Sequence, residues 1–283
     1  MPTLFVASSG PLGGKTTIAA GIARKLADQR VHCTLERTGD DANAAADAAL
    51  FARISSGGQV QISELAAGAS LAGAGGRVVY VATPAEDPAS ITQAPALAGV
   101  IVNHAAPRKA GAIRAAYEAA GVKLLGVVPE DRLLASPTIG EVAEALSAEG
   151  ENIAENRERP LDRPVIASIA ADPGQTYFVR TDATAVIVRS DKPDLQLAAL
   201  NAGPTCLIVT GGLPVLSYVR ERVADEEIPL LRTKLDTKET VAAIEELFGA
   251  KPFSGGAEKL RRIGELLADV NVDALVERLG SKA

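Results

Sequence analysis

The sequence SSGPLGGKTT, residues 8–17, decides the fold expected for this chain. It follows the apolar run TLFVA, residues 3–7, which has the composition of a buried strand. It precedes residues 15–28, in which Ile18, Ile22 and Leu26 recur at the four-residue spacing of a helix. A strand, a glycine-rich connection and a helix in this order predict a βα unit.

The same alternation of short β-branched runs and longer Ala/Leu segments continues along the chain. Further strands are expected at residues 31–35, 77–82, 99–102, 123–128, 165–170, 184–189, 205–210 and 229–233. Helices are expected at residues 41–54, 108–120, 139–148, 194–202, 214–224, 237–248 and 257–268. No element is placed in the Gly-, Ser- and Ala-rich residues 55–76. The pattern predicts an α/β protein with a parallel sheet flanked by helices, followed by a second, smaller α/β domain.

A change in composition marks the expected domain boundary. Residues 148–164, AEGENIAENRERPLDRP, are strongly charged and contain few apolar side chains. Domain boundaries fall in such polar segments. We therefore expect a first domain at residues 1–150, a charged linker at 151–164 and a second domain at 165–283.

Composition restricts the classes of partner. The 283 residues are 47% hydrophobic and carry a formal net charge of −6. Nucleic-acid binding needs clustered Lys and Arg to face the phosphate backbone, so this balance predicts no nucleic-acid partner. A small-molecule partner is expected instead.

The sequence also predicts a cytoplasmic protein without a membrane partner. Cys33 and Cys206 lie in apolar runs with no CxxC spacing, as buried thiols of a reducing compartment do. No apolar run approaches the about 18 residues of a membrane span. The first expected strand begins within three residues of Met1, which leaves no room for a signal peptide.

The glycine-rich loop, residues 8–17, has the chemistry of a phosphate-binding site. Small residues let backbone N–H groups converge on an anion, a lysine reaches the β- and γ-phosphates, and a hydroxyl completes the Mg²⁺ shell. The residues expected to bind ATP in this way are Ser9, Gly10, Gly13, Gly14, Lys15, Thr16 and Thr17. The regular pattern G-x-x-x-x-G-K-[ST] has a glycine where this chain has Ser9, and Pro11 offers no N–H. The alternative is a glycine-containing turn at the start of a helix.

Three segments carry a family resemblance. VASSGPLGGKTTIAAGIARKL, residues 6–26, resembles the opening of dethiobiotin synthetase-like P-loop proteins. GVVPEDRLLASPTIGEVAEAL, residues 126–146, and AVIVRSDKPDLQLAALNAGPTCLIVTGGLPVLSYV, residues 185–219, resemble proteins that join such a domain to a DRTGG domain. The arrangement is also similar to the N-terminal region of long-form phosphate acetyltransferases.

The resemblance implies roles for single residues. It makes Glu64 a candidate Mg²⁺ ligand. The loop chemistry itself makes Lys15 a candidate catalytic group and Thr16 a candidate Mg²⁺ ligand. Asp40 and Asp41, shortly after the second expected strand, are rival carboxylates: Asp40 as a catalytic, water-positioning group and Asp41 as an Mg²⁺ ligand. Each acidic residue can equally be a helix cap or a solvated loop charge.

Two further positions follow from the same comparison. Asn103 falls where related proteins read the adenine edge, for which its amide offers a donor and an acceptor; an ordinary turn residue is the alternative. Where dethiobiotin synthetases hold their substrate with a lysine, this chain has Glu36, which argues against that substrate.

The second domain has a candidate ligand site of its own. Three of its expected strands end in polar loops, and parallel neighbours would bring those loops to one sheet edge. The residues expected there are Ser190, Asp191, Thr210, Gly211 and Gly212. The alternative is structural: Asp194 and Asp236 suit helix caps, and Thr210-Gly211-Gly212 suits a turn.

These observations lead to two expected functions. One is an Mg-ATP-dependent enzyme, with ATP hydrolysis or phosphoryl transfer that activates a carboxylate or carbamate. The other is a regulatory module that senses nucleotide without turning it over. Both imply ATP and Mg²⁺ as cofactors and an unknown small-molecule ligand for the second domain, and the resemblance suggests a homo-oligomer.

Overall fold

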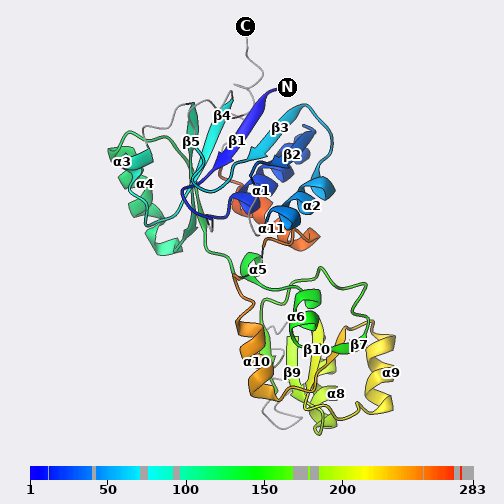
Figure 1. The fold of residues 1–283 in the computed structure, drawn as a ribbon. Helices are drawn as coiled ribbons and strands as arrows, with labels where there is room; N and C mark the ends of the chain where they lie inside the picture. The colour runs from blue at the N-terminus through cyan, green and yellow to red at the C-terminus, as the bar shows by residue number, and fades with distance from the viewer. Residues whose placement is uncertain are drawn as a thin grey trace. The chain divides into compact units, whose positions relative to one another are not determined.

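The protein is described by a computed structural model that covers residues 1–11, 13–39, 43–70, 76–91, 96–167, 178, 185–250, 252–270 and 275. Contacts divide the chain into two compact units. The first comprises Met1–Leu134 and Pro252–Ala283, and the second comprises Ala135–Lys251. Each contains its own sheet with flanking helices (Figure 1), which confirms the expected α/β class. In sequence, the second unit is inserted into the first, so this division does not coincide with the boundaries expected at residues 150 and 165.

The first unit is built on a parallel sheet. Its six described strands lie in the order β2-β3-β1-β4-β5-β6, and every neighbouring pair is parallel. The strands are β1 (Thr3–Ala7), β2 (Cys33–Arg37), β3 (Val60–Glu64), β4 (Arg77–Ala82), β5 (Leu97–Ala105) and β6 (Leu124–Pro129). Because all run the same way, the loops that follow them meet at the carboxyl edge of the sheet.

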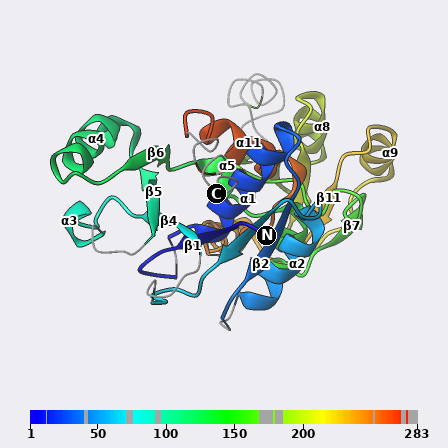
Figure 2. The same ribbon diagram turned by 90° about the horizontal axis from the view of Figure 1, so that it is seen from above.

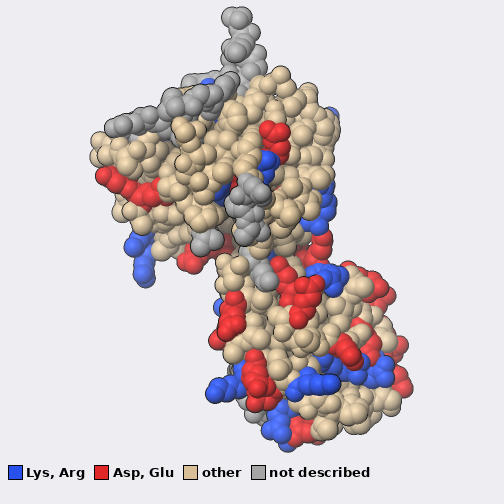
Figure 3. All heavy atoms as spheres, viewed as in Figure 1, with Lys and Arg blue, Asp and Glu red and all other residues tan. Residues whose placement is uncertain are grey.

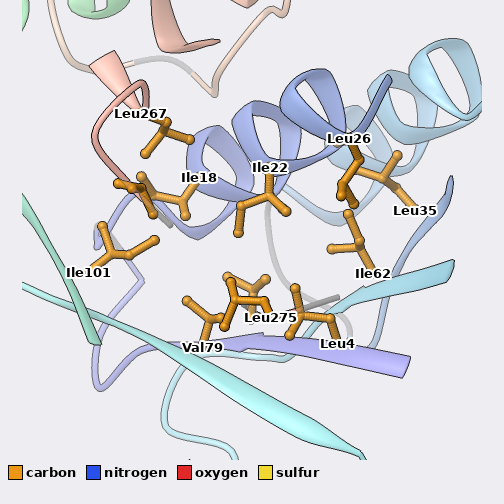
Figure 4. Close-up of a cluster of buried hydrophobic side chains, with 14 of the residues drawn as sticks. Leu4, Ile18, Ile22, Leu26, Leu35, Ile62, Val79, Ile101, Leu267 and Leu275 are labelled. Carbon is orange, nitrogen blue, oxygen red and sulfur yellow. The ribbon is translucent and has the colours of Figure 1, made fainter. Parts of the chain in front are cut away.

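Helices cover both faces of this sheet. They are α1 (Lys15–Asp28), α2 (Ala44–Ile54), α3 (Pro88–Ile91), α4 (Ala110–Ala119) and α11 (Ala257–Leu266), with a 3-10 turn at Pro107–Lys109. The short helix α5 (Arg132–Ala135) crosses the boundary between the two units. Side chains of successive strand residues point to opposite faces. Thus Ile101 packs into the core under α1 (Figure 4), whereas Val100 and Val102 pack in a separate cluster with Tyr117 of α4. A sheet buried on both faces explains why strands such as β4 (RVVYVA) and β6 (LLGVVP) are nearly continuous apolar runs.

Strand β3 lies in the segment where the sequence indicated no element. Three of its five residues, VQISE, are polar, and the segment around it is rich in glycine, serine and alanine. The sheet buries Ser63 and Glu64 in spite of their polarity. Pairing with β1 and β2 on either side, and not local composition, makes this segment a strand.

Helix α11 packs on α1 although the second unit separates them in sequence (Figures 1 and 2). The approach is close at Gly21, where a Cβ atom would lie 2.5 Å from Leu267 Cδ1 and 2.6 Å from Ile263 Cγ1. The ammonium of Lys25 donates hydrogen bonds to the carbonyls of Leu267 (2.8 Å), Ala268 (3.1 Å) and Val270 (2.8 Å). A cation here satisfies the carbonyls that a helix end leaves without partners.

The second unit has a mixed sheet in the order β7-β11-β10-β9-β8. Its strands are β7 (Glu149–Glu151), β8 (Pro164–Ile166), β9 (Ala185–Arg189), β10 (Cys206–Thr210) and β11 (Leu230–Arg232). Its helices are α6 (Ile139–Ala145), α8 (Pro193–Asn201), α9 (Ser217–Asp225) and α10 (Thr237–Glu245). On the face drawn in Figure 3, acidic and basic side chains intermingle over this unit.

The charged segment expected as a linker supplies part of this sheet. Strand β7 pairs antiparallel with β11, with Gly150 opposite Leu231. A Cβ atom at Gly150 would lie 1.6 Å from the carbonyl oxygen of Leu230, so this edge pairing requires glycine. A three-residue strand with two glutamates has no apolar periodicity, and the sequence pattern therefore missed it.

The two cysteines are free and buried, as expected. Burial raises the pKa of the Cys33 and Cys206 thiols. Among the described residues, none of the helices combines the length and the apolar character needed to cross a bilayer.

We expect Lys25→Met to lower the free energy of unfolding by about 1–3 kcal/mol, because it removes three charge-assisted hydrogen bonds and keeps the aliphatic stem. Urea unfolding followed by circular dichroism measures the change. The matched control is Arg24→Met, which removes only a solvent-exposed ion pair with Asp28 and should cost less than about 1 kcal/mol. Equal losses in the two variants would contradict a stabilising role for the hydrogen bonds between Lys25 and the end of α11.

Candidate functional site

The glycine-rich loop joins β1 to α1 at the carboxyl edge of the first sheet. Gly14 occupies the N-cap position of α1 in the left-handed conformation, with φ +80° and ψ 27°. Residues other than glycine rarely adopt this backbone conformation. No side chain of the described residues caps the helix. The first turn therefore presents backbone N–H groups and the positive end of the helix dipole toward the loop.

Lys15 lies inside the loop rather than in solvent. Its side chain is only 4% exposed, and its ammonium donates to the Ser8 hydroxyl at 3.2 Å. That hydroxyl in turn donates to the carbonyl oxygen of Gly10 at 2.6 Å. The geometry combines a buried cation with a helix N-terminus, both of which favour an anion.

The other residues expected at this loop fall in several environments. Thr16 and Thr17 are half-buried in the first turn of α1, and Gly13 is buried. Asn103 comes from the end of β5 and reaches the loop, where its Nδ2 donates to the carbonyl oxygen of Gly13 at 3.1 Å. The structure thus brings Asn103 and the loop together.

Ser9 contacts Glu86, a residue that the sequence did not indicate as part of the site. Its hydroxyl donates to Glu86 Oε2 at 3.0 Å, and the Tyr80 hydroxyl donates to the same oxygen at 2.9 Å. The other oxygen, Oε1, accepts from the backbone N–H of Thr83 at 2.8 Å and from its hydroxyl at 3.2 Å. Burial, together with this carboxylate, raises the pKa of Tyr80. Glu86 therefore ties the start of the loop to the loop that follows β4; an acidic residue soon after a strand was the available signal.

Glu64 lies in a buried ion cluster at the ends of β2 and β3. The Arg37 guanidinium contacts the carboxylate of Asp47 and lies 3.6 Å from Glu64 Oε1. All three side chains are at most 6% exposed. A metal-binding role for Glu64 would have to compete with Arg37. Glu36, at the position where dethiobiotin synthetases have a substrate-binding lysine, is exposed, and Arg37 is the residue that faces these carboxylates.

The remaining acidic candidates, Asp40 and Asp41, lie outside the described residues. Within the described ranges, no group of three or more His, Cys, Asp or Glu side chains is arranged to hold a metal ion. The choice of Mg²⁺ ligand among the acidic candidates therefore stays a prediction.

The second candidate site gathers at the carboxyl edge of the second sheet, after β9 and β10. The Ser190 hydroxyl accepts from the Leu213 N–H at 3.3 Å, and the Thr210 hydroxyl lies 3.0 Å from that of Thr237. The exposed carboxylate of Asp191 forms an ion pair with Arg189, two residues before it, and accepts two hydrogen bonds from its guanidinium.

The two glycines of this site do not present free N–H groups. Gly211 donates to the carbonyl of Leu235 at 2.8 Å, and Gly212 donates to that of Thr233 at 3.1 Å. Both have positive φ, 91° and 75°, so the turn requires glycine for its backbone shape. The turn therefore uses these two amides internally and does not offer them to a ligand.

Comparison with known families places the second unit. The segment 141–247 matches the model of the DRTGG domain. The second unit contains a DRTGG domain. The match begins within α6 and includes β7, so it also assigns the charged residues 148–164 to this domain.

Two solved structures show distant similarity to the chain. One holds the CBS and DRTGG domains of the regulatory region of Clostridium perfringens pyrophosphatase in complex with its activator, diadenosine tetraphosphate; it is 19% identical, with a TM-score of 0.36. The match covers 44% of this chain and 53% of that chain, about half its length. The other is the aminoacrylate-bound tryptophan synthase of M. tuberculosis, 18% identical over 95% of this chain and 93% of that chain, with a TM-score of 0.18. Neither similarity carries an argument about ligands.

We expect Arg37→Met to lower the free energy of unfolding by about 3–5 kcal/mol, because it leaves two buried carboxylates without their shared cation. Urea unfolding without nucleotide measures the loss. The triple variant Arg37→Met with Asp47→Asn and Glu64→Gln removes the negative charges as well and should recover most of it. If the free energy of unfolding of Arg37→Met alone lies within about 0.5 kcal/mol of the parent value, Arg37 does not neutralise this cluster.

Proposed function

We propose that the glycine-rich loop binds the polyphosphate of Mg-ATP and that the chain is a nucleotide-binding regulatory protein. The observation that carries the proposal is the buried Lys15 at the N-terminus of α1, a helix end that no side chain of the described residues caps. An anion at this place gains hydrogen bonds from backbone N–H groups, attraction to the helix dipole and attraction to Lys15. A ligand with several negative charges can use the N–H groups, the helix dipole and Lys15 together. This favours a nucleoside triphosphate over a simple anion.

The loop offers one oxygen ligand that suits Mg²⁺, the hydroxyl of Thr16. Mg²⁺ prefers oxygen ligands and commonly keeps several waters while bridging phosphate oxygens. The Thr16 hydroxyl, in the first turn of α1, is the group that we propose to complete its shell. A bound metal would neutralise part of the phosphate charge and so strengthen binding.

The described carboxylates favour binding without rapid turnover. Glu86 accepts four hydrogen bonds from Ser9, Tyr80 and Thr83, and Glu64 lies beside Arg37. A general base for hydrolysis or phosphoryl transfer must be able to accept a proton from the attacking group. Both carboxylates instead serve contacts within the protein.

We further propose that the DRTGG domain binds a small ligand at the carboxyl edge of its sheet. The support is the pair of hydroxyls on Thr210 and Thr237 beside the Ser190 loop. The hydroxyls are neutral, and the N–H groups of Gly211 and Gly212 already donate within the turn. Such a site suits an uncharged polar group better than a second phosphate.

The test of nucleotide binding is Lys15→Ala. Loss of a charge-assisted contact should weaken Mg-ATP binding by about tenfold to a hundredfold in titration calorimetry. It should also abolish most of the rise in melting temperature that saturating Mg-ATP gives the parent protein. The matched control, Lys109→Ala, changes an exposed lysine and should bind as the parent does. A flat titration with the parent protein would overturn the proposal.

Turnover separates the regulatory protein from the enzyme. With Mg-ATP at saturation, we expect the purified protein to release no more ADP than Lys15→Ala does. Metal-dependent ADP release that Lys15→Ala abolishes, with or without added carboxylic acids, would instead favour an ATP-dependent enzyme.

A further inference from the structure

We propose that Asn103 is a positioning residue that holds the glycine-rich loop in its phosphate-binding shape, and that it does not read the nucleotide base. The inference rests on the proposed binding of a polyphosphate by the loop. It assigns to Asn103 a contact with the protein backbone where the sequence predicted a contact with adenine.

A bulge in β5 delivers this side chain. Val102 pairs with Val127 of β6 and Ala105 pairs with Pro129, so Asn103 and His104 together face one residue of β6. His104 has φ +57°, a conformation that non-glycine residues rarely adopt. Bulges of this kind turn a strand and redirect its side chains, often next to functional sites. Here the bulge lies at the carboxyl end of β5, where Asn103 meets the loop.

The contact is buried and directional. Asn103 is 5% exposed, and its Nδ2 donates to the carbonyl oxygen of Gly13 at 3.1 Å. In a planar trans peptide the carbonyl and the following N–H point in opposite directions. Fixing the Gly13 carbonyl on Asn103 therefore directs the N–H of Gly14 away from Asn103. That N–H immediately precedes the first turn of α1.

Close packing adds a second constraint. A Cβ atom at Gly14 would lie 2.2 Å from Asn103 Nδ2, so the amide fills the space beside this glycine. The positive φ of Gly14 and this contact both require a residue without a side chain. An amide that is packed here and already bonded to Gly13 has little free edge to offer a base.

The experiment compares ligands with and without a base. Titration calorimetry in Mg²⁺ measures the affinities of ATP, GTP and inorganic tripolyphosphate for the parent, Asn103→Ala and Asn103→Leu. Alanine removes the amide without adding charge, and leucine keeps nearly its volume. Asn201→Ala, an exposed position in α8, is the matched control. Melting temperatures establish that each variant is folded at the temperature of the titration.

We expect both Asn103 variants to bind all three ligands about tenfold more weakly, by a common factor, because the lost hydrogen bond shapes the loop itself. The ratio of ATP to GTP affinity should stay as in the parent, and Asn201→Ala should bind normally. A loss confined to ATP, with tripolyphosphate affinity unchanged, would overturn the inference and make Asn103 a base reader. Unchanged affinity for every ligand would overturn it too. If the parent binds none of the three, the proposed function itself fails, which is a distinct result.

Discussion

The burial of α1 is the constraint on which the first unit depends. One face of this helix places Ile18, Ile22 and Leu26 against the parallel sheet, and all three are fully buried. Its first turn forms the end of the glycine-rich loop, and α11 packs against it at Gly21. The helix is therefore held on two sides by apolar contacts, which fixes the direction of its N-terminus. A fixed helix end can present its N–H groups to a ligand without first being ordered.

Around that helix end, the polar groups are largely organised by the protein itself. Lys15 contacts Ser8, Ser9 contacts Glu86, and Asn103 contacts Gly13. These contacts join the loop to the ends of β4 and β5. The loop is thus braced by side chains from neighbouring strands as well as by its own backbone.

The sequence was sufficient for the α/β class, for most helices and for the apolar strands, because periodicity and β-branched runs are local signals. It failed where the decisive contact is distant in sequence. Strand β3 is polar in part and depends on its two neighbours, and β7 depends on β11 and on Gly150. The carboxylates that contact Arg37, and the Ser9 hydroxyl that contacts Glu86, lie on other segments, and no spacing in the chain pairs them.

Inserting the DRTGG domain between Leu134 and Pro252 has a thermodynamic consequence for the first unit. While the inserted domain is folded, its own contacts limit how far its two ends can separate. If it unfolded, β6 and α11 would remain joined by a long flexible chain, and closing such a loop costs about 4 kcal/mol of entropy. A molecule that keeps the inserted domain folded would thereby protect the packing of α11 on α1, without touching either helix.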